Sequence, residues 1–218
     1  MRDIFTAELT ALGEDLTALS RLVETAISSA SSALLTADLE LAESVIADDQ
    51  TIDAQERELD ERCVLLIAQQ QPVASDLRVI VSGLRISASL ERMGDLAQHI
   101  ADIARLRYPA SAIPGTLTDV FTEMAEAAVD IARKVTTVIE HRDVDLAKTI
   151  ETDDDVLDRL HDATFGATTI NGSPLTGQET VDITLAARYF ERFGDHAVSI
   201  ANRVIYLVTG ELGDAEAV

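Results

Sequence analysis

The sequence of 218 residues contains no tryptophan, one cysteine (Cys63), four prolines and ten glycines, and only 4% of its residues are aromatic. A single cysteine excludes an intrachain disulfide and is typical of a protein that works in a reducing compartment. Scarce proline, glycine and aromatic residues, beside abundant alanine, leucine, isoleucine and valine, disfavour a sheet-rich fold. The composition predicts an all-α protein.

Basic residues are also scarce: 17 lysines and arginines stand against 39 aspartates and glutamates, a formal net charge of −22. Without a basic field, the chain has little means of displacing counterions from phosphates, which argues against nucleic acid as a direct partner. The same charge disfavours adsorption to an anionic membrane. A cation, or a protein with a basic surface, remains as a partner.

No apolar run approaches the ~20 residues that a membrane-spanning helix needs. Acidic residues interrupt the stretch from residue 2 to residue 16, where a secretory signal would need an apolar core. We therefore expect a cytoplasmic protein without direct membrane insertion. There is no phosphate-cradling glycine-rich loop, Cys-His pair or nucleophile elbow, so we expect no enzyme.

An internal repeat dominates the sequence. Residues 90–101 read LERMGDLAQHIA and residues 190–201 read FERFGDHAVSIA, with Glu, Arg, Gly, Asp, Ala, Ile and Ala in the same places. Upstream, DDQTIDAQERELDERC begins at Asp48 and DDDVLDRLHDATF begins at Asp153. This alignment pairs Asp49 and Asp53 with positions 154 and 158, and it indicates an internal duplication.

Helical patterns and turn residues divide the repeat into two halves. YPASAIPGT at 108–116 is typical of a linker. The first repeat, 1–107, is predicted to contain helices near 3–34, 37–70 and 73–107. The second, 117–210, is predicted to contain helices near 117–140, 143–169 and 177–210, followed by a flexible acidic tail at 211–218. Helices of ~30 residues are typical of long bundles. We predict two tandem three-helix bundles, joined end to end and related by a pseudo-twofold internal repeat.

Local signals mark several helix ends. Thr116 and Asp143 are predicted N-caps, Thr176 and Glu179 form a predicted capping box, and Gly210 is predicted to close the last helix. NGSP at 171–174 is predicted to interrupt the second repeat between its last two helices.

Each repeat carries two acidic pairs spaced four residues apart, and the later pair encloses a glycine, as in Glu91-Arg92-Met93-Gly94-Asp95. Like charges at i and i+4 on a helix repel by a few tenths of a kcal/mol, and an interior glycine costs ~1 kcal/mol relative to alanine. A chain shaped only by helix stability would contain neither. On a helical projection the later pairs border the apolar face, and the glycine clears space beside them. The pairs are Glu91/Asp95, Glu191/Asp195, Asp49/Asp53 and Asp154/Asp158.

Carboxylate oxygens select hard cations and can bridge several ions, so these pairs are candidate metal ligands. For any single pair, a solvated acidic face is the alternative, and close helix packing is an alternative reason for Gly94 and Gly194. A ferritin-like di-iron site needs two Glu-x-x-His motifs, whereas this chain offers only Asp158-Arg-Leu-His161. His196 is a candidate extra ligand or hydrogen-bond partner.

The two repeated words, together with QQQPVASDLRVIVSGLRIS at 69–87, resemble the PhoU family of phosphate-transport accessory and regulatory proteins. The resemblance covers both repeats. It implies two three-helix bundles whose acidic motifs bind multinuclear metal clusters, with iron, zinc, magnesium or manganese as the ion. Carried over by motif, the ligands are Glu91, Asp95, Glu191 and Asp195, assisted by Asp49, Asp53, Asp154 and Asp158.

The resemblance also implies a function without catalysis. Family members are negative regulators of the phosphate-starvation response, thought to connect the phosphate ABC importer ATPase to a membrane sensor histidine kinase, and they often form homodimers. This sequence has ERMGD and ERFGD where ERIGD is common, and Arg188 has no basic equivalent at Ala88. The two sites are therefore expected to differ in metal occupancy. The alternative function is a metal-free acidic helical scaffold that docks a basic protein partner.

Overall fold

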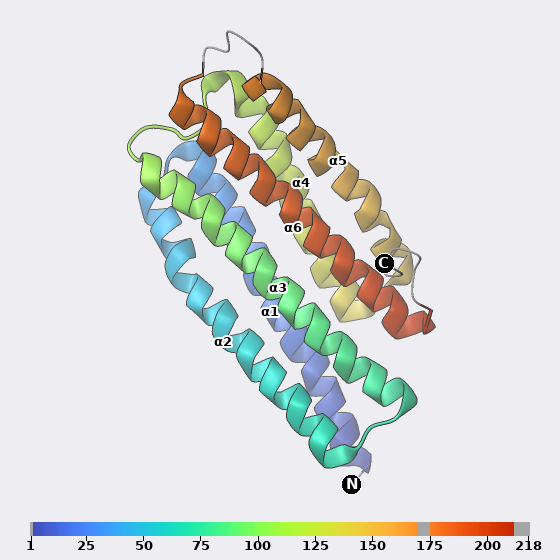
Figure 1. Ribbon diagram of the computed structural model, residues 1–218. Helices are drawn as coiled ribbons and strands as arrows, with labels where there is room; N and C mark the ends of the chain where they lie inside the picture. The colour runs from blue at the N-terminus through green and yellow to red at the C-terminus, as the bar shows by residue number, and fades with distance from the viewer. Residues whose placement is uncertain (1, 170–174, 212–218) are drawn as a thin grey trace.

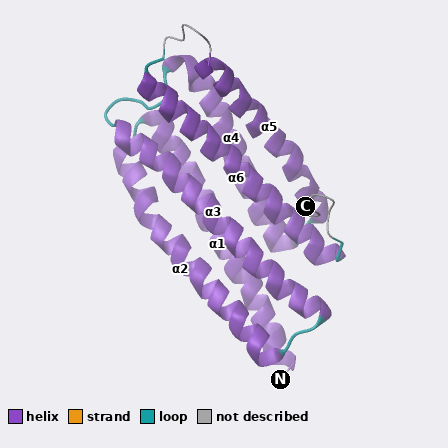
Figure 2. Ribbon diagram, in the orientation of Figure 1, coloured by secondary structure: helices purple, strands orange, loops and turns teal. Residues whose placement is uncertain are grey.

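The computed structural model describes residues 2–169 and 175–211. Within these ranges the chain forms long helices joined by short loops and contains no strand (Figures 1 and 2), which confirms the predicted all-α fold. The helices are α1 (Arg2–Thr36), α2 (Leu39–Gln70), α3 (Ala74–Arg107), the single-turn 3₁₀ helix η1 (Gly115–Leu117), α4 (Thr118–His141), α5 (Val144–Thr169) and α6 (Gly177–Thr209).

The helices α1–α3 form one bundle and α4–α6 form the other, but the bundles do not lie end to end. They lie side by side, with α3 against α6 and α1 against α4, so the end-to-end arrangement was wrong (Figure 1). One continuous apolar core runs through both bundles. The front of the molecule in Figure 1 is a layer in the order α2, α3, α6, α5, and α1 and α4 lie behind it.

The width of each buried stripe explains this arrangement. On α2, buried apolar side chains recur at seven-residue steps, from Val45 through Ile52 and Leu59 to Leu66, a narrow stripe that one neighbouring seam can cover. On α3, buried positions extend around more of the helix and include small residues, among them Gly83 and Ala97. A broad stripe with small residues needs neighbours on several sides, so α3 lies between α2, α1 and α6.

α3 and α6 run antiparallel in a regular register. Arg78 lies against Gly210 at one end of the pair, and the rings of His99 and Tyr189 lie 5.1 Å apart further along. A step forward on α3 therefore corresponds to an equal step backward on α6. By this register Gly94 lies level with its repeat counterpart on α6, so the two acidic motifs are at the same height of the molecule.

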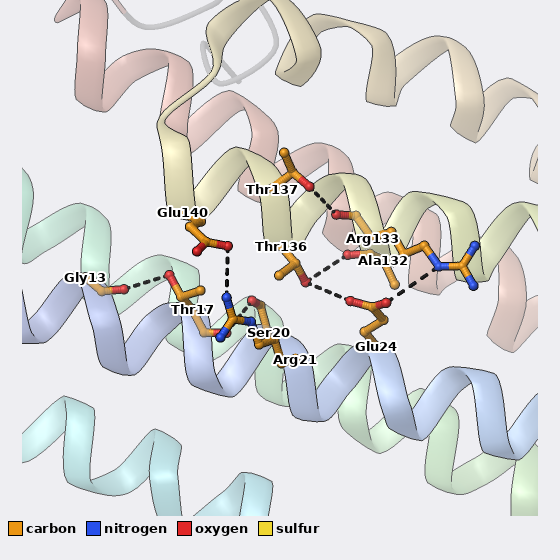
Figure 3. Close-up of polar contacts among 10 residues, drawn as sticks. All are labelled: Gly13, Thr17, Ser20, Arg21, Glu24, Ala132, Arg133, Thr136, Thr137 and Glu140. Atoms are coloured by element: carbon orange, nitrogen blue, oxygen red, sulfur yellow. Dashed lines mark hydrogen bonds and ion pairs between the residues drawn. The ribbon is translucent and has the colours of Figure 1, made fainter.

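Polar contacts join the bundles at both inner helix pairs. Between α1 and α4, Arg21 pairs with Glu140 at 3.0 Å, and Glu24 accepts a hydrogen bond from Thr136 at 3.4 Å (Figure 3). Between α3 and α6, Arg107 donates from Nη2 to the Oδ1 atom of the buried Asp182 at 3.1 Å.

Most predicted helix ends are confirmed. Asp143 accepts hydrogen bonds from the backbone at the start of α5, Thr176 and Glu179 form the capping box of α6, and Gly210 ends α6 with φ of 78°. The N-cap at Thr116 was wrong, because η1 occupies Gly115–Leu117 and α4 starts only after it. The NGSP segment, and the tail beyond Glu211, lie outside the described residues. In the described ranges, no helix is both long enough and apolar enough to cross a bilayer.

Candidate metal centre

The first acidic cluster lies between α2 and α3. Asp49 and Asp53 are one turn apart on α2, and Asp95 on α3 faces them, so that one carboxylate oxygen of each lies within 4.8 Å of the other two. In the described ranges no other set of three acidic, histidine or cysteine side chains converges this closely. Asp49 is buried, with 7% of its surface exposed, and its Oδ1 atom has no hydrogen-bond partner.

Burial and the crowding of like charges raise the pKa values of two carboxyl groups in and beside this cluster, Asp49 and Glu91. Burial, as the largest cause, and the negative charges of Asp53 and Asp95 together raise the pKa of Asp49 to about 6, while His99 opposes this rise. Burial also raises the pKa of Glu91, and Asp95 adds to this rise while Arg92 opposes it. A bound cation would relieve both the desolvation and the repulsion.

Arg92 already neutralises part of the charge. Its Nη1 atom donates to Oδ2 of Asp95 at 2.6 Å, and its Nε atom lies 3.3 Å from Oε2 of Glu91. Sequence reasoning made Glu91 a principal ligand and Asp49 an assistant. In the structure Asp49 belongs to the converging set, whereas Glu91 stands beside it and pairs with Arg92.

Sequence reasoning did not include Glu56 among the ligands. Burial raises the pKa of Glu56, and Asp60 adds to this rise. Glu56 on α2 in turn raises the pKa of Glu91 on the neighbouring helix α3. Its position three residues after Asp53 was the available signal, because this spacing returns to the same helix face.

The second cluster repeats this arrangement between α5 and α6. Asp154 is buried, with 8% of its surface exposed, and its Oδ1 atom has no hydrogen-bond partner. Burial, as the largest cause, and the negative charges of Asp158, Asp195 and Glu191 together raise its pKa to about 7. Arg188 forms an ion pair with Glu191, whose Oε2 atom is buried and unpartnered. All four predicted residues of this repeat therefore interact, although their oxygens do not converge as in the first cluster.

The glycine within each motif lets side chains of the neighbouring helix approach closely, chiefly Asp154 at Gly194 and Ile52 at Gly94. A Cβ atom added to Gly194 would lie 1.8 Å from Oδ1 of Asp154. A Cβ atom on Gly94 would lie 3.0 Å from the side chain of Ile52 and 3.6 Å from Oδ1 of Asp49. At Gly194, close helix packing and the carboxylate site are thus one feature, because the glycine permits the approach of the buried Asp154; at Gly94 the glycine mainly accommodates Ile52.

His196 lies half-buried on α6, near α3. Burial lowers its pKa, Arg192 lowers it further, and Arg92 of α3 acts in the same direction while Asp195 opposes. A histidine near two guanidinium groups favours the neutral ring. Its role as a ligand stays a prediction.

The residues present fit a cation. Each cluster combines a buried carboxylate oxygen that lacks a protein donor with carboxylates that are half-buried in the first cluster and mostly exposed in the second, and a bound cation would satisfy the buried oxygen. Oxygen-rich sites of this kind suit Mg²⁺, Mn²⁺, Ca²⁺ or ferric iron, and a carboxylate can bridge two ions.

Two side-by-side helical repeats, each with an acidic cluster between its second and third helices, define a class of tandem-bundle proteins. The PhoU domain family matches this chain twice, over residues 16–104 and 121–204. The chain belongs to the PhoU family. PhoU proteins are regulatory accessory proteins rather than enzymes, in agreement with the prediction that this chain is not an enzyme.

Phosphate-transport accessory proteins of mycobacteria match this chain over nearly their whole length. Phosphate-specific transport system accessory protein PhoU homolog 2 of Mycobacterium tuberculosis is 40% identical over 210 residues, covering 96% of this chain and 99% of that protein. PhoU homolog 1 of Mycobacterium leprae is 38% identical over 218 residues, covering 100% of this chain and 98% of that protein.

Solved structures show the same fold. The crystal structure of PhoU from Pseudomonas aeruginosa has a TM-score of 0.86 and 32% sequence identity, covering 95% of this chain and 100% of that one. The phosphate transport system regulatory protein PhoU from Streptococcus pneumoniae has a TM-score of 0.87 and 26% identity, covering 96% and 99%.

Proposed function

We propose that this chain is a cytoplasmic, metal-carrying negative regulator of phosphate uptake and of the phosphate-starvation response. The main support for metal binding is the convergence of Asp49, Asp53 and Asp95. The buried Oδ1 atom of Asp49 has no hydrogen-bond partner there. Membership of the PhoU family and relatives named as phosphate-transport accessory proteins support the regulatory role.

The proposed ligands follow the two clusters. In the first, Asp49, Asp53 and Asp95 hold a divalent or ferric ion, and Glu91 extends the site toward a second ion. In the second, the corresponding residues are Asp154, Asp158, Asp195 and Glu191. The ion is iron, zinc, magnesium or manganese. Metal analysis of protein purified without chelator tests this proposal: a metal-to-protein ratio near zero, unchanged on addition of these ions, would contradict it.

We propose further that the chain is a homodimeric adaptor between the ATPase of the phosphate ABC importer and a membrane sensor histidine kinase, held at the inner face of the membrane through these proteins. The net charge of −22 suits basic surfaces on the partners. Pull-down with purified ATPase and kinase, and mass measurement in solution, test the contacts and the dimer. Deletion of the gene should derepress phosphate-starvation genes in rich phosphate; unchanged repression would remove the regulatory role.

A metal-free scaffold is the alternative, and the ion pairs of Arg92 favour it, because they show that the protein neutralises part of its own charge. The double variant Asp53→Asn/Asp95→Asn separates the two functions. A metal-dependent adaptor should lose both the ion and its partner contacts. A scaffold should keep the contacts, weakened only as the loss of two half-buried charges predicts, with a steep dependence on salt.

A further inference from the structure

Among the residues that the structure describes, Arg92 is the arginine that forms ion pairs at the first cluster. Its Nη1 atom donates to Oδ2 of Asp95 at 2.6 Å, and its Nε atom lies 3.3 Å from Oε2 of Glu91. Asp95 also belongs to the converging set, so the guanidinium and a bound cation would share one carboxylate. Arg92 does not satisfy the whole cluster, because the buried Oδ1 atom of Asp49 still has no hydrogen-bond partner.

The side chain of Arg92 can leave these carboxylates at little cost. It is 60% exposed, and its two partners lie on α3 itself, one residue before it and three residues after it. Exposed ion pairs of this kind contribute little to stability, since water solvates the freed charges and the long side chain regains its rotamer freedom. A cation held by several carboxylates is therefore able to compete with this guanidinium.

The second repeat has a matching ion pair that comes from a different position. Arg188 on α6 pairs with Glu191, three residues further along the helix. Its counterpart in the first repeat is Ala88, whereas Arg192, the counterpart of Arg92, forms no ion pair with a described residue. Each Glu-x-x-x-Asp pair thus has one arginine partner, supplied by different residues. The shared feature is compensation of the crowded negative charge.

We infer that Arg92 is the counter-ion of the empty first cluster and that a cation displaces it from Asp95 and Glu91 on binding. This inference rests on the proposed metal-carrying function and adds a control to it. Arg92 lowers the affinity of the site, because the ion must open two ion pairs and approach a positive charge. Empty and occupied protein then present different charges on the exposed side of α3.

The alternative is a supporting role, in which Arg92 holds Oδ2 of Asp95 so that the other oxygen faces the ion. Loss of a residue that supports a ligand lowers metal affinity 10–100-fold. Loss of a competing counter-ion raises it. The two roles therefore predict opposite signs for the same substitution.

The test measures the first cluster alone, in an Asp158→Asn/Asp195→Asn background that disables the second. Mg²⁺, Mn²⁺, Zn²⁺ and, without oxygen, Fe²⁺ are titrated calorimetrically into metal-free protein with and without Arg92→Gln. We expect the affinity for each ion that binds the background to rise about three- to tenfold, since two exposed ion pairs of modest strength no longer have to open.

Arg85→Gln is the matched control. Arg85 is exposed on the same helix and forms no ion pair with a described residue. It lies seven residues before Arg92, about 10 Å along the helix axis, which exceeds the screening length of about 8 Å at physiological ionic strength. Removal of this charge should leave the affinity within about twofold of the background.

Nuclear magnetic resonance of the background protein, with both arginines intact, covers the case in which the Arg92→Gln variant fails to fold. Binding of a diamagnetic ion, Mg²⁺ or Zn²⁺, should shift the Nε–Hε resonance of Arg92 and speed its exchange with water, because the contacts to Glu91 and Asp95 are lost. The resonance of Arg85 should stay in place. A residue that supports Asp95 would instead keep its contact and its slow exchange.

Two results would overturn the inference while the proposed function stands: an affinity of the Arg92→Gln variant that falls or changes no more than that of Arg85→Gln, or an Arg92 resonance that a bound ion leaves unchanged. Failure of the background to bind any of the four ions would also overturn the inference. The same failure in the unsubstituted protein would overturn the metal-carrying function as well.

Discussion

We expect the replacement of Asp49 with asparagine to stabilise the metal-free protein and to make the protein less stable than the parent when a cation is bound. In metal-free protein at pH 8, Asp49 is ionised in the folded and unfolded chain, and its pKa of about 6 in the fold compares with 3.8 ordinarily. Each pKa unit corresponds to ~1.36 kcal/mol, so the buried charge costs the fold about 3 kcal/mol. Asparagine keeps the shape and removes the charge.

The gain will be smaller than this cost, because burying an amide that is incompletely hydrogen-bonded costs about 1–3 kcal/mol. Its NH₂ group can donate to Asp53 or Asp95, which limits that cost. We therefore expect Asp49→Asn to raise the free energy of unfolding by about 1–2 kcal/mol in chelator at pH 8, or a few degrees in Tm for a chain of this size. Urea unfolding followed by circular dichroism measures this change.

Excess cation should reverse the order. The parent gains ~2.7 kcal/mol when the free ion is a hundredfold above its Kd, whereas the variant has lost a ligand and gains less. Asp48→Asn is the control, since it removes the same charge from the neighbouring, exposed position. If Asp49→Asn is less stable than the parent in chelator while Asp48→Asn is neutral, the buried carboxylate is not under electrostatic strain and the reasoning fails.

Three further outcomes follow from the same contacts. Gly194→Ala should lower the free energy of unfolding by about 1–3 kcal/mol, because the methyl group displaces Asp154; Gly94→Ala should lower it less, since Ile52 can shift, and the reverse order in urea unfolding would contradict this. In chelator, stability should fall as pH rises from about 4 to 7: the unfolded chain releases the protons of Asp49 and Asp154 near pH 3.8, whereas the fold holds them until about 6 and about 7. This part of the pH slope should be absent when both are asparagine. Asp182→Ala should lower the free energy of unfolding by ~2 kcal/mol, because the half-exposed Arg107 loses a charge-assisted hydrogen bond to its buried partner; an unchanged Tm would show that the pair contributes nothing.

The sequence alone determined the helices, the duplication and the positions of the acidic motifs. These features depend on local spacing: an apolar stripe, a capping residue such as Asp143, or a carboxylate four residues from another acts within one helix, whatever lies opposite. The capping box at Thr176 and Glu179 is correct for this reason. Thr116 failed because a 3₁₀ turn competes with the start of α4 over the same residues.

Only the tertiary structure decided what covers each helix face. The repeat predicted two bundles, but their side-by-side packing depends on how much of α3 is buried, which emerges when α1, α2 and α6 surround it. The same neighbours decided which carboxylates matter most. Spacing along one helix paired Asp49 with Asp53, whereas the approach of α3 placed Asp49 near Asp95, buried it and raised its pKa. Burial and charge repulsion arise between helices, and for that reason they could not be read from either helix alone.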